Sequence, residues 1–202
     1  MSKTICIIDY NAGNTKSLSN SINKVSDYEV LISNKKEDVV NADYLILPGV
    51  GSYSYVSNYL SEKKIDITLK QQMLEFNKPI LGICLGMQIL FESSTEFGYS
   101  KGLGILEGNV RKFENHKSLP LPNIGWREVT KVNDSAIFKS GNYYFAHSFH
   151  LDNIDDKIII GKSNYSYQFP AVIRKRNFYG VQFHPEKSSK PGLEFLSKFL
   201  KL

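Results

Sequence analysis

The chain has 202 residues, of which 42% are hydrophobic, and this length is enough to bury a sizeable core, so we expect a single domain over residues 1–202. The formal net charge of +5 comes mostly from scattered lysines, and the short basic run IRKRN is too small to indicate a nucleic-acid partner. No run approaches the roughly 18 apolar residues of a membrane span, and the N-terminal residues lack a leader pattern, so we expect a cytoplasmic protein without membrane contact.

The first half of the chain alternates strand-like and helix-like segments. Short apolar runs predict strands over 4–9, 29–33, 43–48 and 78–84. Helices are expected over 14–26, with Asn14 as a potential cap, over 53–76, and from Leu85 onward directly after the fourth strand. Strands that alternate with helices indicate an open, mostly parallel α/β sheet with helices on both faces.

From about Gly102 the pattern changes to short β-rich runs. Residues 172–173 and 179–183 flank a polar turn and predict a hairpin. A stripe of leucines then predicts a closing helix over 191–202. The expected fold is therefore an open, mostly parallel α/β sheet with an antiparallel β extension.

Two cysteines occur in separate apolar runs, and their spacing indicates neither a disulfide framework nor a metal site. Cys6 is expected to be structural. Cys84 lies in GICLGMQ, where Gly82 and Gly86 provide the small neighbours that the tight turn of a nucleophile elbow requires. At a helix start, exposed backbone N–H groups also favour a thiolate. The other interpretation is a buried apolar cysteine.

The segment QFHPEKS carries an imidazole and a carboxylate two residues apart. On an extended segment His184 and Glu186 project from the same side, and Pro185 between them prevents normal ladder pairing. A carboxylate beside an imidazole fixes its tautomer and stabilises the imidazolium, as the third member of a Cys-His-acid triad does. A surface histidine after a strand is the other interpretation.

The segment LPGVGSY follows the third predicted strand. Gly49 and Gly51 permit backbone conformations that other residues disfavour, and N–H groups there could point at an oxyanion. Taken alone, the segment also fits an ordinary strand-to-helix turn. Sites in open α/β sheets form beyond the carboxyl ends of the strands, so three such segments together favour a catalytic site.

Together, PGVG, GICLGMQ and QFHPEKS resemble the class I (triad) glutamine amidotransferases. Over essentially the whole chain, the segments IDYNAGN, GLGILEG, IGW and YFAHSFH resemble, in that order, the glutaminase subunit of imidazole glycerol phosphate synthase. The resemblance implies a glutaminase that forms a γ-glutamyl thioester, hydrolyses glutamine to glutamate and ammonia, and uses no cofactor or metal.

The resemblance assigns a role to each member of the triad. Cys84 attacks the glutamine amide, His184 protonates the departing ammonia and then activates water, and Glu186 orients His184. Backbone N–H groups of Leu85 and of the Val50–Gly51 loop hold the oxyanion.

The same resemblance assigns the glutamine contacts to Gln88, Glu96 and the strand formed by His147, Ser148 and Phe149. Gln88 lies one turn after the nucleophile, so it can face the pocket. For Glu96, a solvated loop carboxylate is the other interpretation.

Released ammonia becomes ammonium in water, so a separate synthase subunit is implied. In the resembled family this is a (β/α)8-barrel cyclase of histidine biosynthesis, and the analogy places Asn14, Trp126 and Lys187 at the contact. For Trp126, a half-buried core residue is the other interpretation.

The chain departs from the family at two places, Asn11 and Asn123–Ile124, and both are expected to face the partner. Two other functions therefore stay open. One is a paralogous subunit that feeds another synthase, such as one aminating a surface-polysaccharide sugar. The other is a stand-alone γ-glutamyl cysteine hydrolase.

Overall fold

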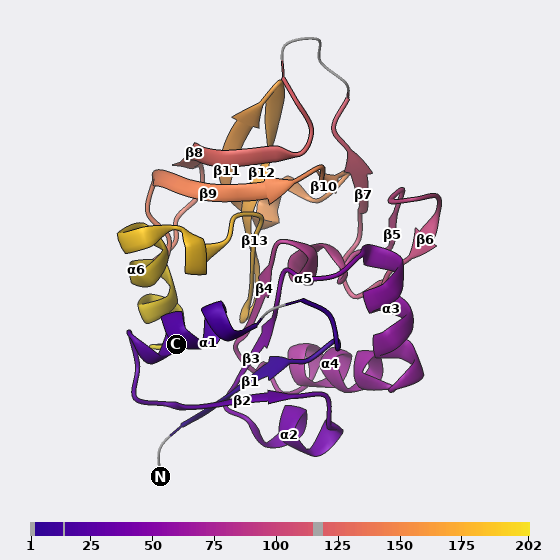
Figure 1. Ribbon diagram of the computed structural model, residues 1–202, viewed down its shortest axis with the longest axis vertical. Coiled ribbons are helices and arrows are strands. Elements are labelled where there is room, and N and C mark those ends of the chain that lie inside the picture. The colour runs from indigo at the N-terminus through magenta and orange to yellow at the C-terminus, as the bar shows by residue number, and fades with distance from the viewer. Residues whose placement is uncertain (1–2, 14, 115–118) are drawn as a thin grey trace.

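Two β-sheets organise the computed structural model of the chain (Figure 1), which describes residues 3–13, 15–114 and 119–202. Within these residues, the larger sheet has nine strands in the spatial order β2 (Glu29–Ser33), β1 (Thr4–Ile8), β3 (Tyr44–Leu47), β4 (Ile80–Ile83), β13 (Phe178–Val181), β12 (Tyr167–Lys175), β11 (Ile159–Tyr165), β8 (Asn123–Lys131) and β9 (Gly141–His147). The smaller sheet has the order β10 (Phe149–Asp152), β7 (Asn109–Lys112), β5 (Ser93–Ser94) and β6 (Ser100–Lys101).

The larger sheet changes direction at β13. Strands β2, β1, β3, β4 and β13 are parallel to one another, whereas β12, β11, β8 and β9 continue the sheet in antiparallel pairing. The predicted hairpin forms between β12 and β13, with Val172 opposite Val181 and Ile173 opposite Gly180. The predicted α/β fold with an antiparallel extension is confirmed.

Helices cover both faces of the parallel part (Figure 1). Strand β1 sorts its side chains by alternation: Ile5 and Ile7 pack in one buried cluster, and Cys6 and Ile8 pack in the other. The first cluster includes residues of α1 (Lys16–Asn23) and α6 (Ser189–Phe199). The second includes residues of α2 (Lys36–Asn41), α3 (Tyr53–Glu62), α4 (Ile65–Leu74) and α5 (Leu85–Gln88). Cys6 is fully buried, as expected of a structural residue.

Several helix boundaries differ from the prediction. The helical region over 53–76 is two helices, because Lys64 adopts a left-handed conformation with φ of 55° between α3 and α4. Helix α2 was not predicted, and α6 begins at Ser189. The potential cap Asn14 lies outside the described residues. Across the described residues, no helix is long and apolar enough to span a bilayer.

Helix α5 is much shorter than the apolar run after it suggested. The carbonyl of Ile89 accepts a hydrogen bond from the N–H of Leu103, and the carbonyl of Leu90 accepts from Ile105 and Leu106. These carbonyls are therefore used by a neighbouring segment, so the helix ends at Gln88. The carboxyl ends of β3, β4 and β13 lie side by side, and they lead directly into the three segments singled out from the sequence.

Candidate active site

Cys84 occupies a strained turn between β4 and α5. Its backbone has φ of 48° and ψ of −110°, which is rare for a residue with a side chain, and its N–H donates to the carbonyl of Val181 at 2.7 Å. A Cβ on Gly82 would lie 2.7 Å from Met87 Cα, and a Cβ on Gly86 would lie 2.0 Å from the carbonyl oxygen of Leu47. Neighbouring backbone therefore excludes any residue larger than glycine at positions 82 and 86. The turn places Cys84 at the carboxyl end of the central strand β4.

His184 lies against Cys84 and is held by Glu186. Its Nδ1 is 2.8 Å from Glu186 Oε1, and its ring lies beside Cys84: a Cβ built on Gly49 would be 2.9 Å from Cys84 Cβ and 3.0 Å from His184 Cε1. Because an ionised carboxylate can only accept a hydrogen bond, Nδ1 carries a proton. Nε2 is then the nitrogen left to exchange a proton with Cys84. Burial lowers the pKa of His184, but the hydrogen bonds and negative charges of Cys84 and Glu186 outweigh burial and raise it to about 10. The imidazolium is the favoured form in this setting.

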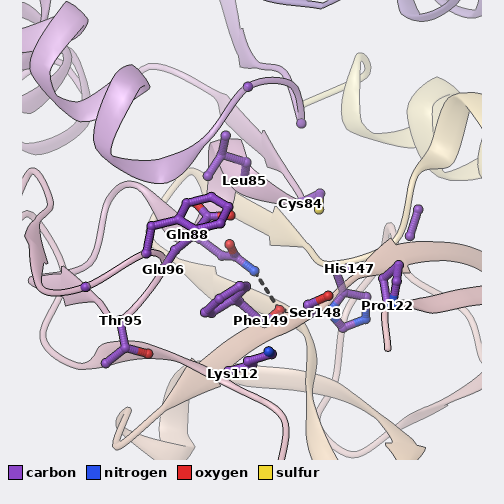
Figure 2. Close-up of a pocket in the computed structure, with 15 residues that line it drawn as sticks. Cys84, Leu85, Gln88, Thr95, Glu96, Lys112, Pro122, His147, Ser148 and Phe149 are labelled. Carbon is purple, nitrogen blue, oxygen red and sulfur yellow. Dashed lines mark hydrogen bonds between the residues drawn. The ribbon is translucent and has the colours of Figure 1, made fainter. Parts of the chain in front are cut away.

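A cavity of about 550 Å³ opens beside the sulfur (Figure 2). Among the residues predicted for oxyanion or glutamine contacts, seven line it: Gly51, Leu85, Gln88, Glu96, His147, Ser148 and Phe149. The other lining residues are Gly49, Cys84, Thr95, Phe97, Gly98, Lys112, Pro122 and Ala146. The turn after β4, helix α5, strands β7, β9 and β10, and the loops after β3 and β5 thus meet around one space.

The loop with Val50 and Gly51 is supported by the N-terminal segment. A Cβ on Gly13 would lie 2.6 Å from Val50 Cβ, so the valine side chain packs against Gly13. Gly51 has φ of 91°, a conformation that favours glycine. Asn11, where the family more often has glycine, has φ of 53°, and asparagine tolerates this left-handed region better than most residues. This departure therefore keeps the backbone conformation that glycine would allow.

Gln88 is fixed by two hydrogen bonds. Its Nε2 donates to the carbonyl of Phe149 and to Gln182 Oε1, both at 2.9 Å (Figure 2 draws the first). Both hydrogens of the amide are used, so Gln88 has only the acceptor Oε1 left for a ligand. Gln182 was not singled out from the sequence, although it stands two residues before His184 and so projects from the same side of an extended segment.

Glu96 is not simply a solvated loop carboxylate. Its Oε2 accepts a hydrogen bond of 2.5 Å from the backbone N–H of Tyr53, the first residue of α3. A carboxylate there satisfies an otherwise unpaired helix N–H and interacts favourably with the helix dipole. The loop that carries Glu96 is therefore anchored to α3 at the edge of the cavity.

His147 is neutral and its tautomer is fixed. Nδ1 donates to the carbonyl of Phe149 at 2.8 Å, and Nε2 accepts from Asn123 Nδ2 at 3.1 Å. Burial, together with the charges of His150 and His184, lowers the pKa of His147 to about 3 despite the bond to Phe149. Asn123 is fully buried, whereas its neighbour Ile124 is 56% exposed, because alternate residues of β8 face opposite sides. The expectation that both would face a partner is wrong for Asn123.

Two of the predicted contact residues, Trp126 and Lys187, lie on one exposed face beside the triad. Trp126 is 46% exposed and meets the ring of Tyr144 edge-on, with centroids 6.1 Å apart. Lys187 Nζ lies 5.9 Å from the centroid of the same Tyr144 ring. The carbonyl of Tyr144 also accepts from the N–H of His184 at 2.8 Å. The partly exposed Trp126 is therefore not a core residue, and Asn14 lies outside the described residues.

The sequence and the fold of the chain match those of a known protein family. The family model described as "Glutamine amidotransferase class-I" matches residues 6–202. The chain belongs to this family. A solved glutamine amidotransferase shares the fold, with a TM-score of 0.75 at 16% identity, over 98% of this chain and 99% of that one. The family resemblance carried by the three motifs is confirmed.

Two archaeal relatives match nearly the whole chain. "Imidazole glycerol phosphate synthase subunit HisH 1" of Methanococcus maripaludis is 38% identical over 204 residues, covering 98% of this chain and 99% of the relative. "Imidazole glycerol phosphate synthase subunit HisH" of Methanocaldococcus jannaschii is 44% identical over 202 residues, covering 98% and 99%. The closer resemblance, to the subunit of this synthase, is thus also confirmed.

Within the described ranges, no group of three or more His, Cys, Asp or Glu side chains is arranged to hold a metal ion. The chemistry that the site's own residues can perform is nucleophilic attack by sulfur, with proton transfer through an imidazole. Gln182, Tyr144 and Lys112 lie near the site but were given no role from the sequence, because none of these side chains has a chemical signature of its own. Asn123 was assigned to the partner face instead of to His147.

Proposed function

We propose that the chain is the glutaminase subunit of imidazole glycerol phosphate synthase, which supplies ammonia to a cyclase in histidine biosynthesis. The observation that carries the chemistry is the contact of Cys84 with a His184 that is held by Glu186 at the edge of a 550 Å³ cavity. Near-complete coverage by relatives with this subunit's name supports the pathway.

The first half of the reaction forms a thioester. The Cys84 thiolate attacks the side-chain carbonyl carbon of glutamine, and the carbonyl oxygen becomes an oxyanion. His184, protonated on both nitrogens, gives its Nε2 proton to the amide nitrogen, the C–N bond breaks, and ammonia leaves. Glu186 accepts the hydrogen bond from Nδ1 of His184 throughout and keeps that proton in place.

The second half hydrolyses the thioester. Neutral His184 accepts a proton from water at Nε2 while the water oxygen attacks the γ-glutamyl carbon. The C–S bond breaks, glutamate leaves, and the thiolate and imidazolium are restored. In both halves the backbone N–H groups of Leu85 and Gly51, on the wall of the cavity, are assigned to the oxyanion, with Val50 as the residue that shapes the loop.

Glutamine recognition is assigned to the rest of the cavity wall. Gln88 Oε1, whose amide hydrogens are already used, suits the substrate α-ammonium group, and Glu96 adds a negative charge nearby. The backbone of residues 147–149 supplies contacts along one side of the substrate. Lys112 brings a positive charge that suits the α-carboxylate.

The proposed partner is a cyclase subunit with a (β/α)8 barrel, bound in a heterodimer over the face that carries Trp126, Tyr144 and Lys187. An exposed tryptophan next to an aromatic ring and a lysine is typical of an interface anchor. Asn14 stays part of this proposal on the resemblance alone. We further propose that the chain is a single domain, works in the cytoplasm, and needs no cofactor, nucleic acid or membrane.

The test is a glutaminase assay of the purified chain, alone and with candidate synthase subunits. We expect strong activation by the cyclase and formation of imidazole glycerol phosphate from glutamine. Cys84→Ala should abolish glutamine-dependent turnover while leaving turnover with added ammonia intact, because the cyclase carries that step. Activation by a sugar-aminating synthase instead, or robust hydrolysis of γ-glutamyl peptides by the chain alone, would favour the alternatives.

A further inference from the structure

Gln182 is a buried amide next to the reactive sulfur. It follows β13, is fully buried, and its backbone N–H donates to the carbonyl of Ala171 at 2.9 Å. Its side-chain Nε2 lies 3.4 Å from Cys84 Sγ, within hydrogen-bonding distance of a sulfur acceptor. The proposed mechanism assigns no role to Gln182. Burying an amide costs free energy unless both its oxygen and its NH2 group are hydrogen-bonded, so the partners of both ends need an account.

The orientation of the Gln182 amide follows from its neighbours. The carbonyl of Phe149 can only accept, so the end of Gln88 that faces it is the NH2 group. The same NH2 group reaches Gln182 at 2.9 Å, so the atom it meets must be the oxygen, Oε1. The other end of Gln182, facing Cys84, is therefore the NH2 group. A flipped Gln182 would set two NH2 groups against each other.

We propose that Gln182 is a positioning residue of the glutaminase that stabilises the Cys84 thiolate by donating an N–H hydrogen bond to its sulfur. The role rests on the proposed function of Cys84 as nucleophile. A donor aimed at sulfur favours the anion, since hydrogen bonds to charged groups are stronger than neutral ones. It also fixes the sulfur's direction through a continuous chain from Phe149 by way of Gln88 and Gln182.

Gln182 acts beside several titratable groups. His184 faces the sulfur from the segment after β13, with Glu186 behind it, and His147 faces the same cavity from β9. Burial lowers the pKa of His147 to about 3, so it stays neutral near neutral pH. Glu96 and Lys112 line the cavity as well. Gln182 differs from all of these because it contributes a donor that does not titrate.

The test is the pH dependence of Cys84 alkylation in the full chain. Iodoacetamide reacts with thiolates, and the rate is followed at each cysteine by mass spectrometry between about pH 5 and about pH 9. Cys6 stays silent, because burial raises its pKa to about 12 and the side chain is fully covered. Gln182→Met keeps the length of the side chain and removes the donor. We expect the midpoint to rise by about 1 to 2 pH units.

Two control variants separate this role from a merely structural one. Gln72→Met replaces another buried glutamine, on α4 and outside the cavity wall, and should leave the midpoint unchanged. Gln88→Met removes the anchor of the amide chain without touching the sulfur, so it should raise KM for glutamine and move the midpoint less than Gln182→Met does. In the cyclase complex, Gln182→Met should lower kcat by about 10- to 100-fold.

An unchanged alkylation midpoint in folded Gln182→Met overturns the proposal. If that variant does not fold, NMR of the wild-type chain replaces it. The side-chain NH2 resonances of Gln182 should shift with pH at the Cys84 alkylation midpoint, and should shift again when methyl methanethiosulfonate caps the sulfur. Resonances that stay constant in both experiments overturn the proposal. Alkylation needs no glutamine. A chain with the expected midpoint shift but no glutaminase activity would therefore count against the proposed function and not against the donor role of Gln182.

Discussion

The His184–Glu186 pair makes folding stability depend on pH in a defined direction. The ordinary pKa of histidine is 6.5, and Cys84 and Glu186 raise that of His184 to about 10 against the opposing effect of burial. A group with a raised folded-state pKa binds its proton more tightly in the folded chain. The stabilisation is therefore fully present below pH 6.5 and is lost as the pH rises through about 10.

Glu186→Gln should remove much of this dependence. The amide keeps a hydrogen-bond acceptor for His184 Nδ1 but carries no charge, so the pKa of His184 should fall. We expect the variant to lose about 1 to 3 kcal/mol of unfolding free energy below pH 6.5 and to approach wild type near pH 10, as measured by urea denaturation at both ends. An equal difference between the two proteins at both pH values would contradict the raised pKa.

The residues predicted from the sequence and those missed differ in how they act. Cys84, His184 and Glu186 carry reactive groups at spacings with a direct geometric meaning, so motifs identify them as candidates. Gln182 and Asn123 act through amide orientation, which depends on a partner distant in the chain: Cys84 and Gln88 for Gln182, His147 for Asn123. A sequence pattern does not carry that pairing.

At the scale of elements, the strands were predicted best, because the parallel strands β1, β3 and β4 are short, almost entirely buried apolar runs. The four-stranded sheet was largely missed, since β5 and β6 have only two residues each and leave no periodicity to detect. Helix α5 was overestimated because an apolar run predicts a helix until another segment takes its carbonyls, and that segment starts about fifteen residues later.

The elbow formed by β4 and α5 depends on glycine for steric reasons. Gly86→Ala would place a Cβ 2.0 Å from the carbonyl oxygen of Leu47, which is backbone of β3 and has little freedom to move. We expect a loss of about 3 kcal/mol in unfolding free energy and loss of glutaminase activity, because the turn that holds Cys84 must shift. Chemical denaturation and the glutaminase assay measure the two effects.

Gly141→Ala is the matched control for this substitution. Its Cβ would meet nothing closer than Tyr143 Cε2 at 3.8 Å, which is an ordinary contact, at the first residue of β9. We expect a change within about 0.5 kcal/mol and normal activity. Equal losses in the two variants would mean that the close approach of Gly86 to β3 does not determine the geometry of the elbow.

At the scale of the whole molecule, strand β9, in the antiparallel part of the large sheet, links the triad to the proposed partner face. Strand β9, at the edge of the nine-stranded sheet, contributes His147 to the cavity and Tyr144 to the surface. The backbone carbonyl of Tyr144 accepts a hydrogen bond from the N–H of His184, and the backbone N–H of Tyr144 donates to Ser188 Oγ at 2.9 Å. A partner that contacts the Tyr144 ring therefore touches a residue bonded to the triad segment.

This arrangement predicts different effects on binding and on basal chemistry for a substitution at the face. Trp126→Ala removes an exposed ring that packs edge-on against Tyr144 and lies outside the cavity wall. We expect it to weaken cyclase binding by about 2 kcal/mol, or about 30-fold in Kd, with basal glutaminase activity unchanged. Titration of the cyclase subunit with glutaminase activity as the readout gives both values. Ile67→Ala, at an apolar side chain 57% exposed on α4, is the control and should bind normally; equal weakening by both variants, or none by Trp126→Ala, would move the partner to another face.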